Sequence, residues 1–287
     1  MVPMKGVIVA AGYGTRFLPV TKTVPKELLP VGTKPAIAYI VDEFIASGIK
    51  EIIIVSSRRK KSLEDYFDRE VELEGVFQKE GKADKLAAVA PPDAEFFFVR
   101  QREMRGTGHA LLTVKPLIGN EPCVVAYPDD LHVGQPPLSQ QLIDVYKKTG
   151  KSVMATIYEP GDVSRYGVVD PAPDGVSVRG FVEKPAAGRE PSHEVSIGRY
   201  LYTPDFFDFV EEGWKKHTGG EYFHSYALDH LIASGRMAYK RVEGKRLDTG
   251  DPRGYLEAIL WNAAGDPHLR PELERFYRED FGKEGRA

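Results

Sequence analysis

A glycine-rich segment near the start of the chain has the residue types that bind a polyphosphate. The string VIVAAGYGTRFLP begins as an apolar strand and then breaks at Gly12 and Gly14, followed by Thr15 and Arg16. Glycines after a strand let backbone N–H groups approach phosphate oxygens, and nearby cations balance the charge. Arg16 and Lys26 supply such cations. The segment therefore predicts an anion-binding loop that suits a triphosphate.

Common phosphate-binding strings match this segment only in part. A dinucleotide-binding fold prefers a third glycine, but position 17 is Phe17, and the chain has no GxxxxGK[ST] string of the P-loop type. A GxG pair alone is more typical of a tight turn between a strand and a loop. The two glycines by themselves thus leave a turn and a phosphate site both open.

Carboxylates follow a second apolar stretch. VVAYPDD puts Asp129 and Asp130 at the end of a predicted strand, where their charges need a cation or a ligand because unpaired burial is costly. Asp248, in LDTGDP, stands just before a predicted helix, where an N-cap or turn role is the commoner one for aspartate. The lone cysteine and the scattered histidines show no close spacing that would indicate zinc.

The loops that carry these residues need a scaffold. In the first half, short β-branched runs alternate with amphipathic stretches, which is the order of a parallel sheet with helices on both faces. Strands are predicted at 6–10, 51–56, 96–100 and 123–127. Apolar residues spaced by three and four predict a helix between the first two strands, ending at Ser47 and Gly48. These residues are Ile37, Ile40, Val41, Phe44 and Ile45.

The rest of the chain changes in texture. Residues 69–92 are charged and partly helical, which predicts an excursion between the second and third strands. After Ser152, β-rich pieces separated by proline and glycine predict a second sheet region. The remaining predicted elements are helices at 205–214, 226–233 and 252–264 and a strand at 237–242.

Longer strings carry a family resemblance. AAGYGTRFLP followed by TKTVPKELLPVGTKP resembles the signature of the sugar nucleotidyltransferase family, and this favours the phosphate site over the plain turn. Further blocks follow in the family's order: FVRQREMRGTGHAL, VVAYPDDLH, RYGVVD, GFVEKP, SIGRYLYTPDFF and LDTGDPRGYLEAI. The spacing and the PKE triplet are most similar to the bacterial members that use UTP and glucose 1-phosphate.

The resemblance implies a fold and a domain plan. The expected fold is α/β, a doubly wound, Rossmann-like, mostly parallel sheet with a β-rich sugar-binding insertion and C-terminal helices. A single nucleotidyltransferase domain is expected over residues 1–287. Within it, 1–150 would form the nucleotide-binding half, 151–250 the sugar-binding half and 251–287 a C-terminal helical segment.

The resemblance also implies a role for each matching residue. The nucleotide would contact Ala11, Gly12, Gly14, Thr15, Glu27, Gln101 and Gly106. The sugar would contact Tyr166, Gly167, Glu183, Lys184 and Gly198. The catalytic set would be Arg16, Lys26, Asp129, Lys184 and Asp248. Asp129 and Asp248 would hold Mg²⁺, which commonly takes one or two carboxylates together with substrate phosphates.

The implied reaction joins UTP to glucose 1-phosphate and gives UDP-glucose and pyrophosphate. An oxygen of the sugar phosphate attacks the α-phosphorus in line, so no protein nucleophile is needed. Because a phosphate monoester is largely ionised near neutral pH, alignment and charge neutralisation do most of the work. A site of cations, backbone amides and a carboxylate-held Mg²⁺ suits that chemistry.

Composition limits the classes of partner and compartment. A formal net charge of −3 over 287 residues argues against a nucleic-acid-binding protein. No apolar stretch reaches the length of a membrane span, so a soluble protein is expected. Cys123 is the only cysteine, which suits a reducing compartment, and the cytoplasm is the prediction. The family commonly forms homo-oligomers, and a dimer or tetramer is expected.

Three alternatives stay open. A thymidylyltransferase differs from a uridylyltransferase by one methyl group on the pyrimidine, which is worth only modest discrimination. A catalytically silent sensor of sugar nucleotides would keep the fold but lose charged residues that this chain retains. A nicotinamide-dependent oxidoreductase is disfavoured by the incomplete glycine fingerprint. Tyr226 also replaces an acidic residue of the family pattern, which puts the sugar side or a subunit contact in question.

Overall fold

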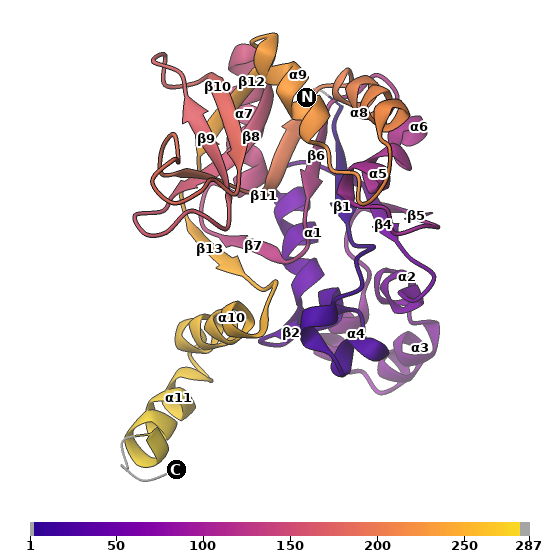
Figure 1. The fold of residues 1–287 in the computed structure, drawn as a ribbon. Helices are drawn as coiled ribbons and strands as arrows, with labels where there is room; N and C mark the ends of the chain where they lie inside the picture. The colour runs from indigo at the N-terminus through magenta and orange to yellow at the C-terminus, as the bar shows by residue number, and fades with distance from the viewer. Residues whose placement is uncertain (1–2, 282–287) are drawn as a thin grey trace.

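One nine-stranded sheet forms the centre of the protein, whose computed structural model describes residues 3–281 (Figure 1). The strand order is β10-β9-β11-β6-β1-β4-β5, and β8 adds to β11 and carries β12. The bounds are β1 Lys5–Val9, β4 Glu51–Ser56, β5 Glu95–Arg100, β6 Cys123–Ala126, β8 Ser152–Tyr158, β9 Gly167–Pro171, β10 Val178–Glu183, β11 Glu194–Tyr202 and β12 Met237–Arg241.

The part of the sheet formed by β1, β4, β5 and β6 is parallel. β1 pairs in parallel with β4 on one side and β6 on the other, and β4 pairs in parallel with β5. Their sequences read as continuous apolar runs because both faces of a parallel sheet are covered. All four carboxyl ends therefore open at the same edge of the sheet, as the fold prediction requires.

Helices cover both faces of this sheet. Successive residues of a strand point to opposite faces of the sheet. Val7 and Ile8 of β1 therefore belong to separate apolar clusters, one on each face. The first cluster contains residues of α1 and α7, and the second contains residues of α5, α8 and α9. The helices span α1 Ala36–Ala46, α2 Lys61–Phe67, α5 Thr107–Leu112, α6 Lys115–Ile118, α7 Leu138–Thr149, α8 Phe206–Lys216 and α9 Ser225–Ala233. The predicted doubly wound architecture is confirmed.

Local sequence explains the first helix and the excursion. Ile37, Ile40 and Phe44 are fully buried on one side of α1, and Gly48 follows the helix with a φ of 79°, a conformation that glycine adopts at little cost. Between β4 and β5 the charged stretch forms α3 and α4, whose residues are exposed or half-buried. These helices span Val71–Lys79 and Ala83–Val89.

The expected second sheet is wrong, because the β-rich pieces after Ser152 extend the first one. β11 runs antiparallel to β6, with Leu201 opposite Val124, and it also pairs with β8 and β9. β6 has β1 on one side only, so its other edge would expose a row of unpaired N–H and C=O groups. β11 supplies their partners and joins the two halves through one continuous sheet.

Two further features position the site. β7 (Asp130–Val133) and β13 (Lys245–Asp248) form an antiparallel ribbon apart from the main sheet. β13 leads into α10 (Pro252–Gly265), and α10 and α11 (Arg270–Phe276) project from the body, followed by a π-helical turn at Tyr277–Phe281 (Figure 1). Residues 282–287 of the expected C-terminal segment lie outside the described residues. Within residues 3–281, no helix combines the length and apolar character needed to span a bilayer.

Candidate active site

The glycine-rich segment forms an irregular loop above the end of β1. Three single turns of 3₁₀-helix follow it, at Thr15–Phe17, Val20–Lys22 and Lys26–Leu28. Gly14 has a φ of 69°, and the Thr21 hydroxyl donates a 2.7 Å hydrogen bond to its carbonyl. A Cβ placed on Gly12 would meet no heavy atom within 4 Å. The loop thus presents an open stretch of backbone where a phosphate needs it.

A cavity of about 300 Å³ lies beside this loop. Predicted nucleotide-contacting residues that line it are Ala11, Gly12, Glu27, Gln101 and Gly106, and the predicted catalytic residues Lys26 and Asp129 line it too. Tyr13 and Phe223 also line it, and these residues are 55% and 53% exposed. Aromatic rings and a polar amide together suit a planar base. Thr15 and Arg16 are exposed and are not among the lining residues.

The Gln101 amide is held in a defined orientation at the cavity wall. Its Nε2 donates to the Gly106 carbonyl at 3.0 Å and lies 3.1 Å from His109 Nδ1. Gly106 has a φ of 94°, and a Cβ there would come within 2.5 Å of the Tyr222 carbonyl oxygen. The amide oxygen of Gln101 has no protein partner among these contacts, so it can accept a hydrogen bond from a base.

Lys26 and Asp129 form an ion pair between the loop and the end of β6. Lys26 Nζ lies 2.5 Å from Asp129 Oδ2. Burial alone would raise the pKa of Asp129, but the Lys26 ammonium outweighs it and holds that pKa below its usual range. Burial likewise opposes the charge on Lys26, yet Asp129 raises the Lys26 pKa overall. Both groups are therefore charged at neutral pH.

Glu27 is a supporting residue in this structure. Its side chain is 1% exposed, and its two carboxylate oxygens accept from Lys60 Nζ at 2.7 and 2.8 Å. Lys60 also donates to the Ala10 carbonyl at 2.5 Å, directly before the glycine loop. Burial lowers the pKa of Lys60, and the Glu27 carboxylate opposes that shift. The buried pair fixes the base of the loop beneath the cavity.

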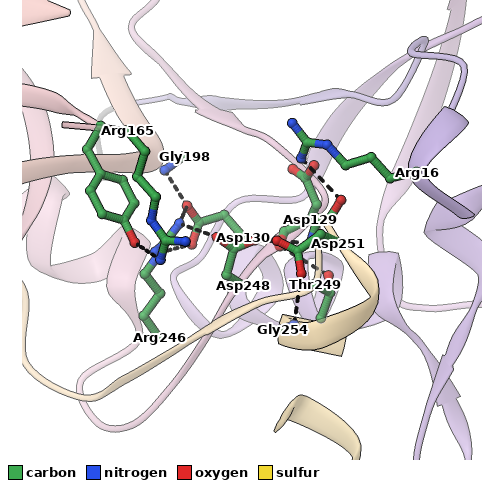
Figure 2. Close-up of polar contacts among 12 residues, drawn as sticks. Arg16, Asp129, Asp130, Arg165, Gly198, Arg246, Asp248, Thr249, Asp251 and Gly254 are labelled. Carbon is green, nitrogen blue, oxygen red and sulfur yellow. Dashed lines mark hydrogen bonds and ion pairs between the residues drawn. The ribbon is translucent and has the colours of Figure 1, made fainter. Parts of the chain in front are cut away.

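Asp248 lies next to Asp129, although they are far apart in sequence (Figure 2). A Cβ built on Gly250 would be 3.0 Å from Asp248 Oδ1 and 3.2 Å from Asp129 Oδ2, so one point faces both carboxylates. The backbone holds this arrangement, since Thr249 N donates to the Asp129 carbonyl at 2.7 Å. The N-cap of α10 is Asp251, which accepts from Arg253 N and Gly254 N, so Asp248 has no capping role.

Arg16 reaches the same point from the loop. Its Nη1 donates to the Gly250 carbonyl at 3.2 Å and lies 3.5 Å from the position of a Gly250 Cβ (Figure 2). The side chain is exposed, so it is free to turn toward an anion. Arg16 thereby joins the carboxylate pair without lining the cavity itself.

Asp130 has a different environment from its neighbour Asp129. Arg246 clamps it with bonds of 2.8 and 3.0 Å, and Gly198 N donates to it at 2.7 Å. Arg246 also donates to Asp248 Oδ2 at 3.2 Å. Asp130 thus has three protein hydrogen bonds and a side chain that is 11% exposed, whereas the Asp129 side chain is 29% exposed and lines the cavity. Of the adjacent pair, Asp129 is the one suited to a metal.

Two of the predicted sugar residues, Tyr166 and Gly198, contact this clamp. Tyr166 lies beside Arg246, with its ring centre 5.7 Å from the guanidinium carbon. Gly198 is fixed by Asp130, and a Cβ there would be 2.9 Å from Asp130 Cβ. Gly167 pairs with Glu183 across β9 and β10, and a Cβ on Gly167 would come within 2.2 Å of the Phe181 ring. Glycine is required at both positions by close approach.

Lys184 and Glu183 are exposed at the end of β10. Their side chains are 67% and 61% exposed, and Nζ lies 3.9 Å from Glu183 Oε1. Lys184 has a φ of 49°, which among residues 3–281 is the only positive φ outside glycine. Its N–H donates to the Tyr166 carbonyl at 2.9 Å. Such backbone conformations cost free energy and concentrate at ligand sites.

Several contributing residues were absent from the prediction. Arg246 had a usable signal, because it stands two residues before Asp248 on one strand and so shares its face. Lys60 lies in a basic run, SSRRKK, where nothing marks it as the buried member. Tyr13 and Phe223 occur among other exposed aromatic residues with no distinguishing pattern.

The residues present fit a divalent cation. Asp248 Oδ1 and Asp129 Oδ2 lie 3.0 and 3.2 Å from the position that a Gly250 Cβ would take, so the two carboxylates border the same small region. In the described part of the chain, no cluster of three or more His, Cys, Asp or Glu forms a complete cage. A site with two carboxylates suits Mg²⁺, because that ion keeps waters and takes further oxygens from substrate phosphates.

A parallel sheet with a backbone-lined cavity and an adjoining carboxylate pair at its carboxyl edge defines a nucleotide-binding α/β protein. The chain belongs to the nucleotidyl transferase family, whose model matches residues 5–263. It is 42% identical over 281 residues to a UTP–glucose-1-phosphate uridylyltransferase of Staphylococcus epidermidis, covering 96% of this chain and 97% of that protein.

Solved structures agree with this family. The UTP-bound UGPase from Acinetobacter baumannii is 31% identical with a TM-score of 0.87, and the match covers 98% of this chain and 100% of that one. A UDP-glucose pyrophosphorylase complexed with UDP-glucose is 38% identical with a TM-score of 0.81, covering 93% and 100%. The two structures hold, respectively, a nucleoside triphosphate and a sugar nucleotide.

Proposed function

We propose that this chain converts UTP and glucose 1-phosphate to UDP-glucose and pyrophosphate, with Mg²⁺ as the metal. The observation that carries the proposal is the meeting of the Lys26–Asp129 pair, Asp248 and Arg16 beside a cavity lined by loop backbone. Relatives named for this activity cover nearly the whole chain, which supports the choice of substrates.

The nucleotide side binds and aligns UTP. The uracil ring would enter the cavity between Tyr13 and Phe223 and hydrogen-bond to Gln101. The triphosphate would run along the backbone of Gly12 and Gly14. Lys26 would neutralise charge at the α-phosphate, because the ion pair with Asp129 keeps its ammonium protonated.

The reaction needs alignment more than proton transfer. A non-bridging oxygen of glucose 1-phosphate forms a bond to the α-phosphorus, and the bond from that phosphorus to the bridging oxygen of pyrophosphate breaks. Arg16 would stabilise charge on the departing pyrophosphate, and Lys184 would hold the attacking phosphate. Bound between Asp129 and Asp248, Mg²⁺ would supply Lewis-acid charge neutralisation at the phosphates.

The sugar side would orient the attacking group. Glu183 would accept hydrogen bonds from sugar hydroxyls, and Tyr166, Gly167 and Gly198 would form the pocket floor. The contact of Tyr166 with Arg246 and the hydrogen bond from Gly198 N to Asp130 support this assignment, because they hold both residues beside the clamp. Tyr226 lies outside this set, since its hydroxyl bonds to Glu212 and Lys216 of α8.

A substrate panel tests the proposal. The purified protein is mixed with UTP, dTTP, ATP, CTP or GTP and with a series of sugar 1-phosphates, and pyrophosphate release is measured with and without Mg²⁺. UTP with glucose 1-phosphate should give the highest kcat/KM, and omission of the metal should stop turnover. A clear preference for dTTP would mean a thymidylyltransferase, and no turnover with any pair would favour a silent sensor.

Other expectations stay predictions. The continuous sheet supports a single nucleotidyltransferase domain, and limited proteolysis should give one resistant core. A homodimer or homotetramer is predicted from the family, and light scattering on the eluted protein measures it. The single cysteine, Cys123, is buried, which is compatible with a reducing cytoplasm.

A further inference from the structure

We propose that Arg246 is a positioning residue that selects which oxygen of Asp248 faces the metal. The inference rests on the proposed function in one respect, that Asp248 is taken as a metal ligand. Arg246 donates to Asp248 Oδ2 at 3.2 Å (Figure 2), and Gly250 N donates to Oδ1 at 3.0 Å. Oδ1 is the oxygen that lies across the gap from Asp129 Oδ2.

Repulsion between two carboxylates of the β7–β13 ribbon explains why the positive charge of Arg246 is needed beside Asp248. Asp248 of β13 lies directly opposite Asp130 of β7. Like charges in directly opposite positions destabilise a strand pair. Arg246 lies on the same face and bonds to both carboxylates, so its guanidinium offsets their repulsion. Without that charge, the Asp248 carboxylate would move away from Asp130 and from its present orientation.

The clamp is anchored to the main sheet. Asp130 accepts from Gly198 N on β11, and the Asp130 and Arg246 side chains are only 11% and 16% exposed. The bidentate geometry needs the planar fork of arginine, which lysine does not provide. Arg246→Lys therefore keeps the charge but loses the fork, and it separates positioning from simple neutralisation.

Arg179 of β10 offers a matched control. It makes a similar two-bond clamp on Asp170 of the neighbouring antiparallel strand β9, at 2.8 and 2.7 Å, and its side chain is 64% exposed. Arg179→Lys thus removes an equivalent fork at a place remote from Asp248. Any general effect of losing a cross-strand clamp should be present in both variants.

The test measures Mn²⁺ binding to the protein without substrates, from the loss of the free-ion electron paramagnetic resonance signal. Arg246→Lys should weaken Mn²⁺ binding about tenfold, which corresponds to about 1.4 kcal/mol, and Arg179→Lys should leave it unchanged. Asp130→Asn should weaken it by a similar factor, and the double variant by no more than the larger single effect. Circular dichroism and Tm confirm folding, and the Kd for UTP measured without metal should stay the same.

Each outcome decides the inference. Mn²⁺ binding by Arg246→Lys that equals the wild type, or a wild-type protein that binds no Mn²⁺ at millimolar concentration, would overturn it. A loss of UTP binding equal to the loss of Mn²⁺ binding would show a general structural role and overturn it too. Because no sugar phosphate is present, failure of the substrate panel with a normal Mn²⁺ result would reject the proposed function alone.

Discussion

The proposed nucleotide side and the proposed sugar side of the site differ in how far their charged side chains are paired and buried without a ligand. Lys26, Asp129, Glu27 and Lys60 are joined by short ion pairs with low exposure around a defined cavity. Glu183 and Lys184 are largely exposed and lie 3.9 Å apart. Preorganised charges stabilise a transition state more effectively than charges that must be ordered on binding.

This difference indicates a division of labour. In the proposed function the nucleotide side fixes the phosphates and the metal, so substitutions there should lower activity or stability. The sugar side should contribute mainly to binding of the second substrate, because an exposed cation gains less from each contact. The four predictions that follow test this division in order of decreasing expected effect.

The largest effect is expected on losing a carboxylate beside Gly250. Asp129→Ala or Asp248→Ala should lower kcat/KM at least about a thousandfold, because a two-carboxylate metal site loses half its charge. Steady-state kinetics at saturating Mg²⁺, with circular dichroism for the fold, measures this. Asp144→Ala, at an exposed position of α7, is the control. Near-normal turnover with unchanged Mg²⁺ dependence would contradict the assignment of Asp129 and Asp248 as metal ligands.

Lys60→Met tests the support beneath the loop. Removing one partner of a buried ion pair leaves Glu27 charged and unpaired, so the free energy of unfolding should fall by about 3–5 kcal/mol. Lys50→Met removes a lysine from an exposed pair with Asp93 and should cost less than about 1 kcal/mol. Urea unfolding of both variants makes the comparison. Equal, small losses of unfolding free energy would mean that the Lys60–Glu27 pair stabilises the protein no more than an exposed ion pair does.

Gly250→Ala should obstruct the proposed metal site without removing a proposed ligand. Gly250 does not have a positive φ, so alanine is sterically allowed by the backbone, but its methyl group would stand between Asp129 and Asp248. We expect roughly a hundredfold loss of kcat, as for one preorganised contact, with little change in Tm. Gly75→Ala, where a Cβ has open space, is the control. Full activity of Gly250→Ala would place the ion elsewhere.

Lys184→Ala and Arg16→Ala compare the two sides directly. Lys184→Ala should raise the KM for glucose 1-phosphate about tenfold with little change for UTP, a modest effect because the side chain is exposed. Arg16→Ala should act mainly on kcat, because charge on the leaving pyrophosphate grows toward the transition state. Saturation series in each substrate distinguish them. If Lys184→Ala raised only the KM for UTP, the assignment of Lys184 to the sugar phosphate would be wrong.

The strands of the N-terminal half and the loops that follow them could be predicted from the sequence, because each loop directly follows its apolar strand. β1, its loop and Asp129 lie directly in or after apolar stretches, and the structure brings Asp248 to Asp129. The number of sheets was predicted wrongly because strand partners are set by free edges, which a single segment does not reveal. The buried partner of Glu27 was missed because burial of Lys60 depends on packing from distant segments.

The pairing of β11 with β6 has a mechanical consequence. Gly198 on β11 is hydrogen-bonded to Tyr127 N and to Asp130, in the segment that carries Asp129, so the proposed sugar and metal sites are joined by strand and side-chain hydrogen bonds. A hinge between the halves would have to break strand hydrogen bonds there. We therefore expect any closure over substrates to come from surface loops, such as residues 12–24 and 184–193, with the sheet as a fixed floor.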